Sequence, residues 1–155
     1  MKARFAAVVG GVGLLLAAVP VVAHHSFAAE FDAAKAVKLS GPVTKIEWMN
    51  PHTYFYLDVT EMCEGGADAA KANNWKCSAV DKSKVPNWGM EMGSPNGLMR
   101  QGWTRNSMKI GDVVTVEGSR AKDGSTVGNA RTVMLNGKRL FAGSSQDQTP
   151  GTPQQ

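Results

Sequence analysis

Residues 52–59 alternate strictly between two kinds of side chain, and this alternation constrains the fold more than any other feature of the chain. One set is apolar or β-branched: Thr53, Phe55, Leu57 and Val59. The other set carries an imidazole, two phenols and a carboxylate: His52, Tyr54, Tyr56 and Asp58. A period of two residues is typical of a strand with one face in a core and the other face open. We therefore predict a half-buried strand here.

Short apolar runs separated by turn signals predict further strands around this one. Glycine and proline inside a strand indicate a bulge or an edge, so the first strand is expected to bend at Gly41-Pro42. The expected strands are residues 37–48, 52–59, 87–92, 113–119 and 130–135, with residues 139–141 as a candidate for a short last strand.

A short helix is predicted between the third and fourth strands. Ser94-Pro95 combines a favourable N-cap residue with proline at the first helical position. Leu98 and Met99 are expected to face the core, and Gly102 is suited to the position just after the helix.

Three strands, a helix and two strands follow the order of a five-stranded Greek-key barrel of the OB type. We predict this all-β fold with one short helix for residues 37–142, and a β-sandwich is the alternative. Residues 24–36 are interpreted as a lead-in segment, in which residues 27–31 could make a helical turn. Residues 143–155 are too polar to bury apolar surface, and we expect a disordered tail.

Residues 1–23 have the order of features of a secretory signal peptide: two basic residues, an apolar stretch, and small residues before a cleavage site after Ala23. An uncleaved membrane anchor is the alternative. Removal of Lys2 and Arg4 leaves 15 basic and 13 acidic residues, a net charge of +2. We predict a periplasmic protein that has no membrane span after cleavage and binds no nucleic acid.

The two cysteines, Cys63 and Cys77, are predicted to form a disulfide, because an exported protein meets an oxidising compartment. Their spacing is not that of a zinc site. The bridge would staple an excursion over residues 61–86 and contribute about 3 kcal/mol in the chain-entropy model.

The three histidines form a candidate metal site. After cleavage, His24 offers a free α-amine and a ring nitrogen to one metal ion, and His52 offers a third nitrogen. Nitrogen ligands in a tetragonal arrangement suit Cu(II), and His25 is a substitute or a fourth ligand. Met49, Met90 and Met92 are candidate soft ligands for Cu(I). The alternative is a solvated terminus, with His52 as a polar turn residue.

The open face of the strand over residues 52–59 is a second candidate site. Tyr54, Tyr56 and Asp58 lie on it, and Glu91 joins them if Trp88, Met90 and Met92 point inward. Aromatic rings with a few polar groups suit a small organic or glycan ligand. Exposed tyrosines that merely favour a strand are the alternative.

Trp103 is expected to cover one end of the barrel, with Arg105 paired to Glu91 or Asp112. Complete catalytic motifs are missing from the sequence, so we assign no catalytic residue.

Five short motifs, taken together, resemble a family of small, exported and functionally uncharacterised bacterial proteins. They are His24-His25-Ser26-Phe27, Asn50-Pro51-His52, Glu91-Met92-Gly93-Ser94-Pro95-Asn96, Gly102-Trp103-Thr104-Arg105 and Gly128-Asn129-Ala130-Arg131. The resemblance implies a signal peptide, a Gram-negative envelope setting and a small β-barrel. The excursion that holds both cysteines looks like an insertion relative to the usual pattern of this family.

The leading functional hypothesis is a periplasmic protein that binds copper or another divalent metal through His24, His25 and His52. A module that binds a small ligand or an envelope protein without metal is the alternative. An oxidative copper enzyme is a third class, which also needs an open coordination position.

Overall fold

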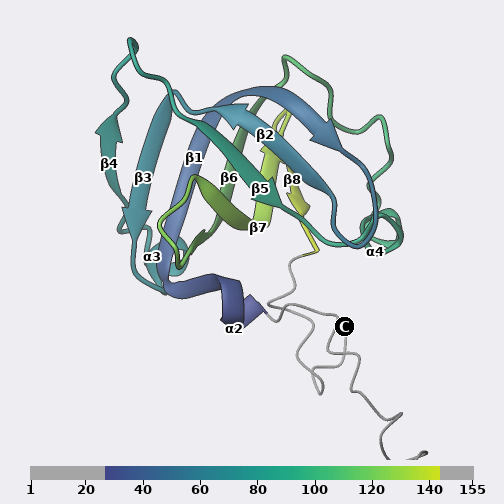
Figure 1. The fold of residues 1–155 in the computed structure, drawn as a ribbon, viewed down its shortest axis with the longest axis horizontal. Coiled ribbons are helices and arrows are strands. Elements are labelled where there is room, and N and C mark those ends of the chain that lie inside the picture. The colour runs from purple at the N-terminus through teal and green to yellow at the C-terminus, as the bar shows by residue number, and fades with distance from the viewer. Residues whose placement is uncertain (1–26, 144–155) are drawn as a thin grey trace, which may run out of the picture.

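The computed structural model describes residues 27–143, which form one small β-barrel with short helices (Figure 1). The barrel strands are β1 (Phe31–Glu47), β2 (Tyr54–Asp58), β5 (Asn87–Glu91), β6 (Val113–Ala121) and β7 (Val127–Leu135). The remaining strands are β3 (Glu61–Gly65), β4 (Lys76–Ala79) and β8 (Lys138–Phe141), and the helices are α2 (Phe27–Glu30), α3 (Ala69–Ala72) and α4 (Pro95–Arg100).

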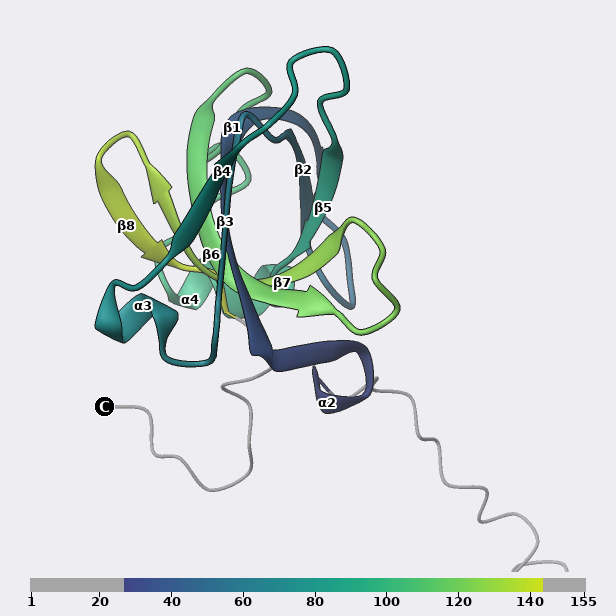
Figure 2. The ribbon, with the colours of Figure 1, turned by 90° about the vertical axis from the view of Figure 1, so that its left-hand side faces the viewer.

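Five strands close the barrel in the order β1-β2-β5-β7-β6, and β6 returns to β1. Four of the pairings are antiparallel, whereas β5 and β7 are parallel. Helix α4 lies between the third and fourth barrel strands, and Figure 2 shows the barrel from its side. This order is that of an OB-type barrel. The predicted fold class is therefore confirmed, and the β-sandwich is not formed.

Strand β1 begins at Phe31, six residues earlier than the sequence predicts. The cause is the burial of Phe31, which is 3% exposed and pairs with Ala121 of β6. The irregularity expected at Gly41-Pro42 lies slightly further on, since the pairing of β1 with β2 shifts register between Val43 and Lys45 while the pairing with β6 continues through Gly41 and Pro42. Gly41 has a steric role instead, because a Cβ atom there would lie 1.9 Å from the carbonyl oxygen of Asp58. Only glycine lets the two chains approach this closely.

The short helix is formed as predicted, but only one of the two side chains expected to face the core is buried. Ser94 Oγ accepts a hydrogen bond from the Gly97 amide, and Gly102 adopts a positive φ of 89° just after the helix. Leu98 is fully buried, as expected, whereas the side chain of Met99 is 52% exposed. The expectation that Met99 faces the core is wrong, because a helix this short turns only one narrow face to the barrel.

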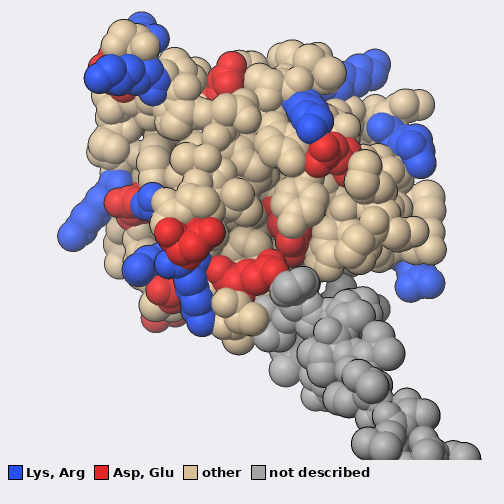
Figure 3. Space-filling model, in the orientation of Figure 1, with Lys and Arg blue, Asp and Glu red and all other residues tan. Residues whose placement is uncertain are grey.

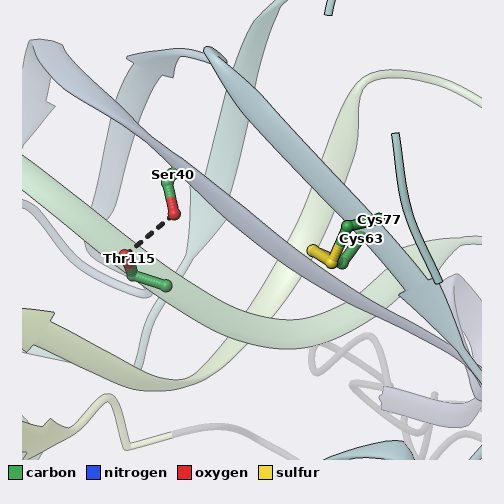
Figure 4. Close-up of a disulfide and its surroundings, with 4 residues drawn as sticks. All are labelled: Ser40, Cys63, Cys77 and Thr115. Carbon is green, nitrogen blue, oxygen red and sulfur yellow. Dashed lines mark hydrogen bonds between the residues drawn. A yellow bond between two sulfur atoms is a disulfide. The ribbon is translucent and has the colours of Figure 1, made fainter. Parts of the chain in front are cut away.

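Cys63 and Cys77 form the predicted disulfide, and it joins two paired strands rather than an irregular loop. Residues 61–86, predicted only as a stapled excursion, contain β3, α3 and β4. Cys63 and Cys77 face each other directly across the β3–β4 hairpin (Figure 4). Strand β3 pairs with β1, so the hairpin extends the sheet outside the barrel.

The predicted signal peptide, the residues His24 and His25, and most of the predicted tail lie outside the described residues. Among residues 27–143, no helix is both long and apolar enough to cross a membrane.

Candidate functional site

The two faces of β2 differ as the sequence predicts. Thr53, Phe55, Leu57 and Val59 are fully buried, and the core also contains Trp88, Met90 and Met92 of the neighbouring strand. The side chains that alternate with them, His52, Tyr54, Tyr56 and Asp58, are partly exposed. Trp88, Met90 and Met92 therefore point inward, which is the condition under which Glu91 is expected on the open face.

Glu91 is the centre of this face, and its side chain is buried. Tyr54 lies directly opposite Glu91 in the β2–β5 pairing, and its hydroxyl donates a hydrogen bond to Oε2. Asn129 Nδ2 donates to Oε1 over 3.3 Å, and the whole residue Glu91 is 4% exposed. A buried carboxylate is stable only when such donors replace the lost water. We call His52, Tyr54, Glu91 and Asn129 the Glu91 cluster.

His52 completes the Glu91 cluster from the loop before β2. Its Nδ1 lies 3.1 Å from Oε1 of Glu91, a separation typical of an ion pair. The ring N–H is not aligned on that oxygen as a hydrogen bond requires. The Nδ1 atom is buried while the side chain is 25% exposed, so solvent reaches the ring elsewhere.

Tyr54 is held in its protonated form. Burial is the main cause that raises the pKa of Tyr54, and the hydrogen bond to Glu91 raises it further. The negative charge of Glu30 acts in the same direction as a smaller cause. Figure 3 shows acidic and basic side chains mixed on the part of the surface where α2 lies in Figure 1.

A second, more exposed group surrounds Tyr56. Its hydroxyl donates to Glu47 Oε2 over 2.8 Å, and Lys45 Nζ lies 2.6 Å from Glu47 Oε1. Lys45 also lies 5.0 Å from the centre of the Tyr56 ring. The hydrogen bond from Lys45 is the main cause that lowers the pKa of Glu47, and Tyr56 contributes.

The structure therefore divides the predicted ligand face into three parts. Tyr54 and Glu91 join His52, Tyr56 joins Glu47, and Asp58 accepts a hydrogen bond from Asn87 over 2.8 Å. The rings of Tyr54 and Tyr56 still stack, with centroids 6.5 Å apart. The four predicted residues share a face, but they do not converge on one point.

The remaining predictions have mixed outcomes. Trp103 is buried, and its Nε1 donates to the carbonyl of Phe141 over 2.7 Å, so this ring packs at the barrel end. Arg105 is exposed and forms no ion pair with Glu91 or Asp112 within residues 27–143. The expected pairing of Arg105 is wrong, because the Glu91 cluster already supplies the donors of that carboxylate.

Sulfur ligands are not supported in the described part of the chain. Met90 and Met92 are core residues with at most 1% exposure, whereas Met49 is 57% exposed. Glu61 lies beside Cys63 and Cys77, but the two sulfur atoms are bonded to each other. Sulfurs joined in a disulfide are not the thiolates that bind metal ions.

Sequence reasoning does not identify Asn129 as a partner of Glu91. The two residues are brought together by the parallel pairing of β5 with β7, in which Glu91 lies opposite Asn129. The available signal was the Gly128-Asn129 pair, since a Cβ atom at position 128 would lie 3.0 Å from the end of the Met90 side chain and 3.2 Å from the backbone carbonyl of Ser119. Glycine at this position therefore leaves room for Met90 beneath the strand.

Comparison with known proteins gives one family. The model of DUF6152, a family of unknown function, matches residues 12–79 and 72–131, and these two segments together cover most of the chain. The chain belongs to DUF6152. The two segments matched by the DUF6152 model overlap within the β3–β4 hairpin. No curated protein and no solved structure matches the chain.

Proposed function

We propose that this DUF6152 protein binds Cu(II) in the periplasm through His52 and the N-terminal histidines. The observation that carries the proposal is the contact of 3.1 Å between His52 Nδ1 and the buried carboxylate of Glu91. Histidines that bind metals generally direct their second ring nitrogen to a carboxylate, a carbonyl or a water, which fixes the ring. Glu91 stands at that distance from Nδ1 of His52 without a hydrogen bond in this structure, so the proposal requires the ring to turn onto the carboxylate when metal binds, with Nε2 as the ligand atom.

The carboxylate itself is held in place. Tyr54 and Asn129 donate to its two oxygens from different strands, so Glu91 has little freedom to follow the ring. A fixed second shell is what distinguishes a prepared ligand from a surface histidine. This arrangement supports a metal site more strongly than a metal-free one, because the hydroxyls of Tyr54 and Tyr56 already donate to carboxylates.

The proposal needs the start of the described chain to lie within reach of His52. Helix α2 directly precedes β1, and Glu30 is among the smaller causes that raise the pKa of Tyr54, whose hydroxyl donates to the carboxylate beside His52. Phe27 lies three positions after His24, a span of at most roughly 11 Å. The proposal therefore assigns the His24 amine and ring as further ligands, with His25 as a substitute or fourth ligand. The signal-peptide pattern of residues 1–23 supports export, and so does the Cys63–Cys77 disulfide, because disulfides persist in an oxidising compartment.

The test is a titration of the purified protein with Cu(II), read by EPR, after intact mass has shown that the chain starts at His24. We expect one tight site with a nitrogen-rich spectrum. The His52→Ala variant and a variant with one glycine added before His24 should both lose this tight site. Unchanged affinity in both variants would overturn the proposal.

The role of Glu91 can be tested separately. Glu91→Gln should weaken Cu(II) binding about 10- to 100-fold while the nitrogen pattern of the EPR spectrum persists, because a second-shell partner is lost and no ligand is removed. Glu61→Gln on β3 is the matched control, since Glu61 is exposed and pairs with Ser40 of β1, seven positions along that strand from the partner of Tyr54. Equal affinities in the two variants would show that Glu91 does not orient the ring.

A further inference from the structure

A cavity of about 710 Å³ lies between β1, the β3–β4 hairpin and the turn after β6. Four cationic side chains line it and only one carboxylate does: Lys35, Lys76, Arg120, Lys122 and Glu64. We call it the basic cavity. None of the residues of the Glu91 cluster lines it, so it is a separate feature of the surface.

The charge of the basic cavity is only partly compensated. Arg120 donates to Glu64 over 3.0 Å, and Asp32 lies 3.8 Å from Lys35 at the rim. Lys76 and Lys122 remain without a carboxylate partner among the described residues. Since like charges repel each other, an excess of cations around one hollow favours an anionic occupant.

Arg120 is a fixed element of the cavity rather than a mobile surface charge. Its guanidinium lies 5.5 Å from the centre of the Trp88 ring, and it contacts both Glu64 and the carbonyl of Gly124. A charge held by several contacts loses little freedom when a ligand binds. Lys122 is also held, since its Nζ donates to the carbonyl of Ala28, whereas Lys76 is exposed and can approach an anion as a point charge.

We propose that the basic cavity binds a small polyanion, a molecule with at least two phosphate or carboxylate groups. The volume lies in the usual range for small-molecule sites. One wall comes from the hairpin, where Glu64 follows Cys63 and Lys76 precedes Cys77. The disulfide thus holds Lys76 opposite Glu64, the partner of Arg120, which gives the staple a role in the site.

The test uses metal-free protein, because polyanions also chelate Cu(II). Inorganic pyrophosphate and citrate are titrated at physiological ionic strength, and binding is followed by calorimetry and by amide NMR shifts. We expect one site, with the largest shifts at Gly65, Gly66 and Gly124, which line the cavity. The probe that binds more tightly shows whether phosphate or carboxylate groups are preferred.

The variant K76Q/K122Q should weaken binding of that probe at least tenfold. K82Q/K84Q is the matched control with the same change in net charge, since these exposed lysines lie outside the cavity lining, and it should bind as the wild type does. His52→Ala should also keep full affinity, so this proposal and the copper proposal can fail separately. Binding of neither probe, or equal weakening in both double variants, would overturn the proposal.

Discussion

Two glutamates beside β2 each accept a hydrogen bond from a tyrosine of that strand, but their surroundings differ. Glu91 is buried and is approached by His52 and by an amide, whereas Glu47 is partly exposed and is paired with Lys45. The same residue type therefore stands in two environments. One carboxylate is buried beside an imidazole, and the other belongs to an exposed ion pair that contributes little to stability.

The pKa of Glu47 gives a prediction at this scale. Lys45→Gln should raise the pKa of Glu47 more than Tyr56→Phe does, because the hydrogen bond from Lys45 is the larger cause of its lowered value. A lowered carboxyl pKa stabilises the fold above the ordinary pKa, and this stabilisation is lost as pH falls through the folded-state value. Carboxyl chemical shifts recorded in an NMR pH titration measure both changes. A larger effect of Tyr56→Phe would contradict the assignment.

At the scale of elements, features with a local cause could be predicted from the sequence. The alternation over residues 52–59 depends only on burial of one face, and the start of α4 depends on Ser94 and Pro95 alone. The β3–β4 hairpin could not be predicted, because residues 64–76 are rich in glycine, alanine and asparagine and show no alternation. Its strands form through pairing with β1 and through the disulfide.

The residues of the site divide in the same way into those that local sequence patterns could predict and those that depend on contacts between distant segments. Tyr54 and Glu91 could be placed on one face from the two-residue period of their strands. Asn129 could not be placed, because its approach depends on the parallel register of β5 and β7. The sequence also cannot show that His52 lies beside Glu91, since 39 positions separate them and only the β2–β5 pairing joins them.

Helix α4 allows a paired test of burial. Leu98→Ala should lower the free energy of unfolding by about 2–5 kcal/mol, because it removes a fully buried side chain from the core. Met99→Ala, one residue further on, should change it by less than about 0.5 kcal/mol, because Met99 is largely exposed. Urea denaturation measures both values. Similar losses in the two variants would mean that Met99 is buried after all.

At the scale of the whole molecule, β1 connects the barrel to the hairpin. It pairs with β2 and β6 to close the barrel and with β3 to carry the hairpin. The disulfide joins two strands that both lie outside the closed barrel. Stability of the barrel and stability of the hairpin are therefore separable.

Removal of the disulfide should have a local effect. In the double variant Cys63→Ala with Cys77→Ala, we expect faster hydrogen exchange of the amides at residues 61–79 and nearly unchanged protection of Val116 and Val133 in the barrel core. Exchange followed by mass spectrometry or NMR measures this difference. An equal loss of protection in the hairpin and in β6 and β7 would show that the two regions unfold together.

The parallel pairing of β5 with β7 also imposes an order in time. His52, Tyr54 and Glu91 leave the ribosome before Asn129, and β7 is the strand that joins β5 to β6. Until that late strand is in place the barrel has a gap, and the Glu91 carboxylate lacks its amide donor. A growing or prematurely truncated chain therefore lacks the assembled Glu91 cluster, and a complete cluster is itself a sign that synthesis and folding of the barrel are finished.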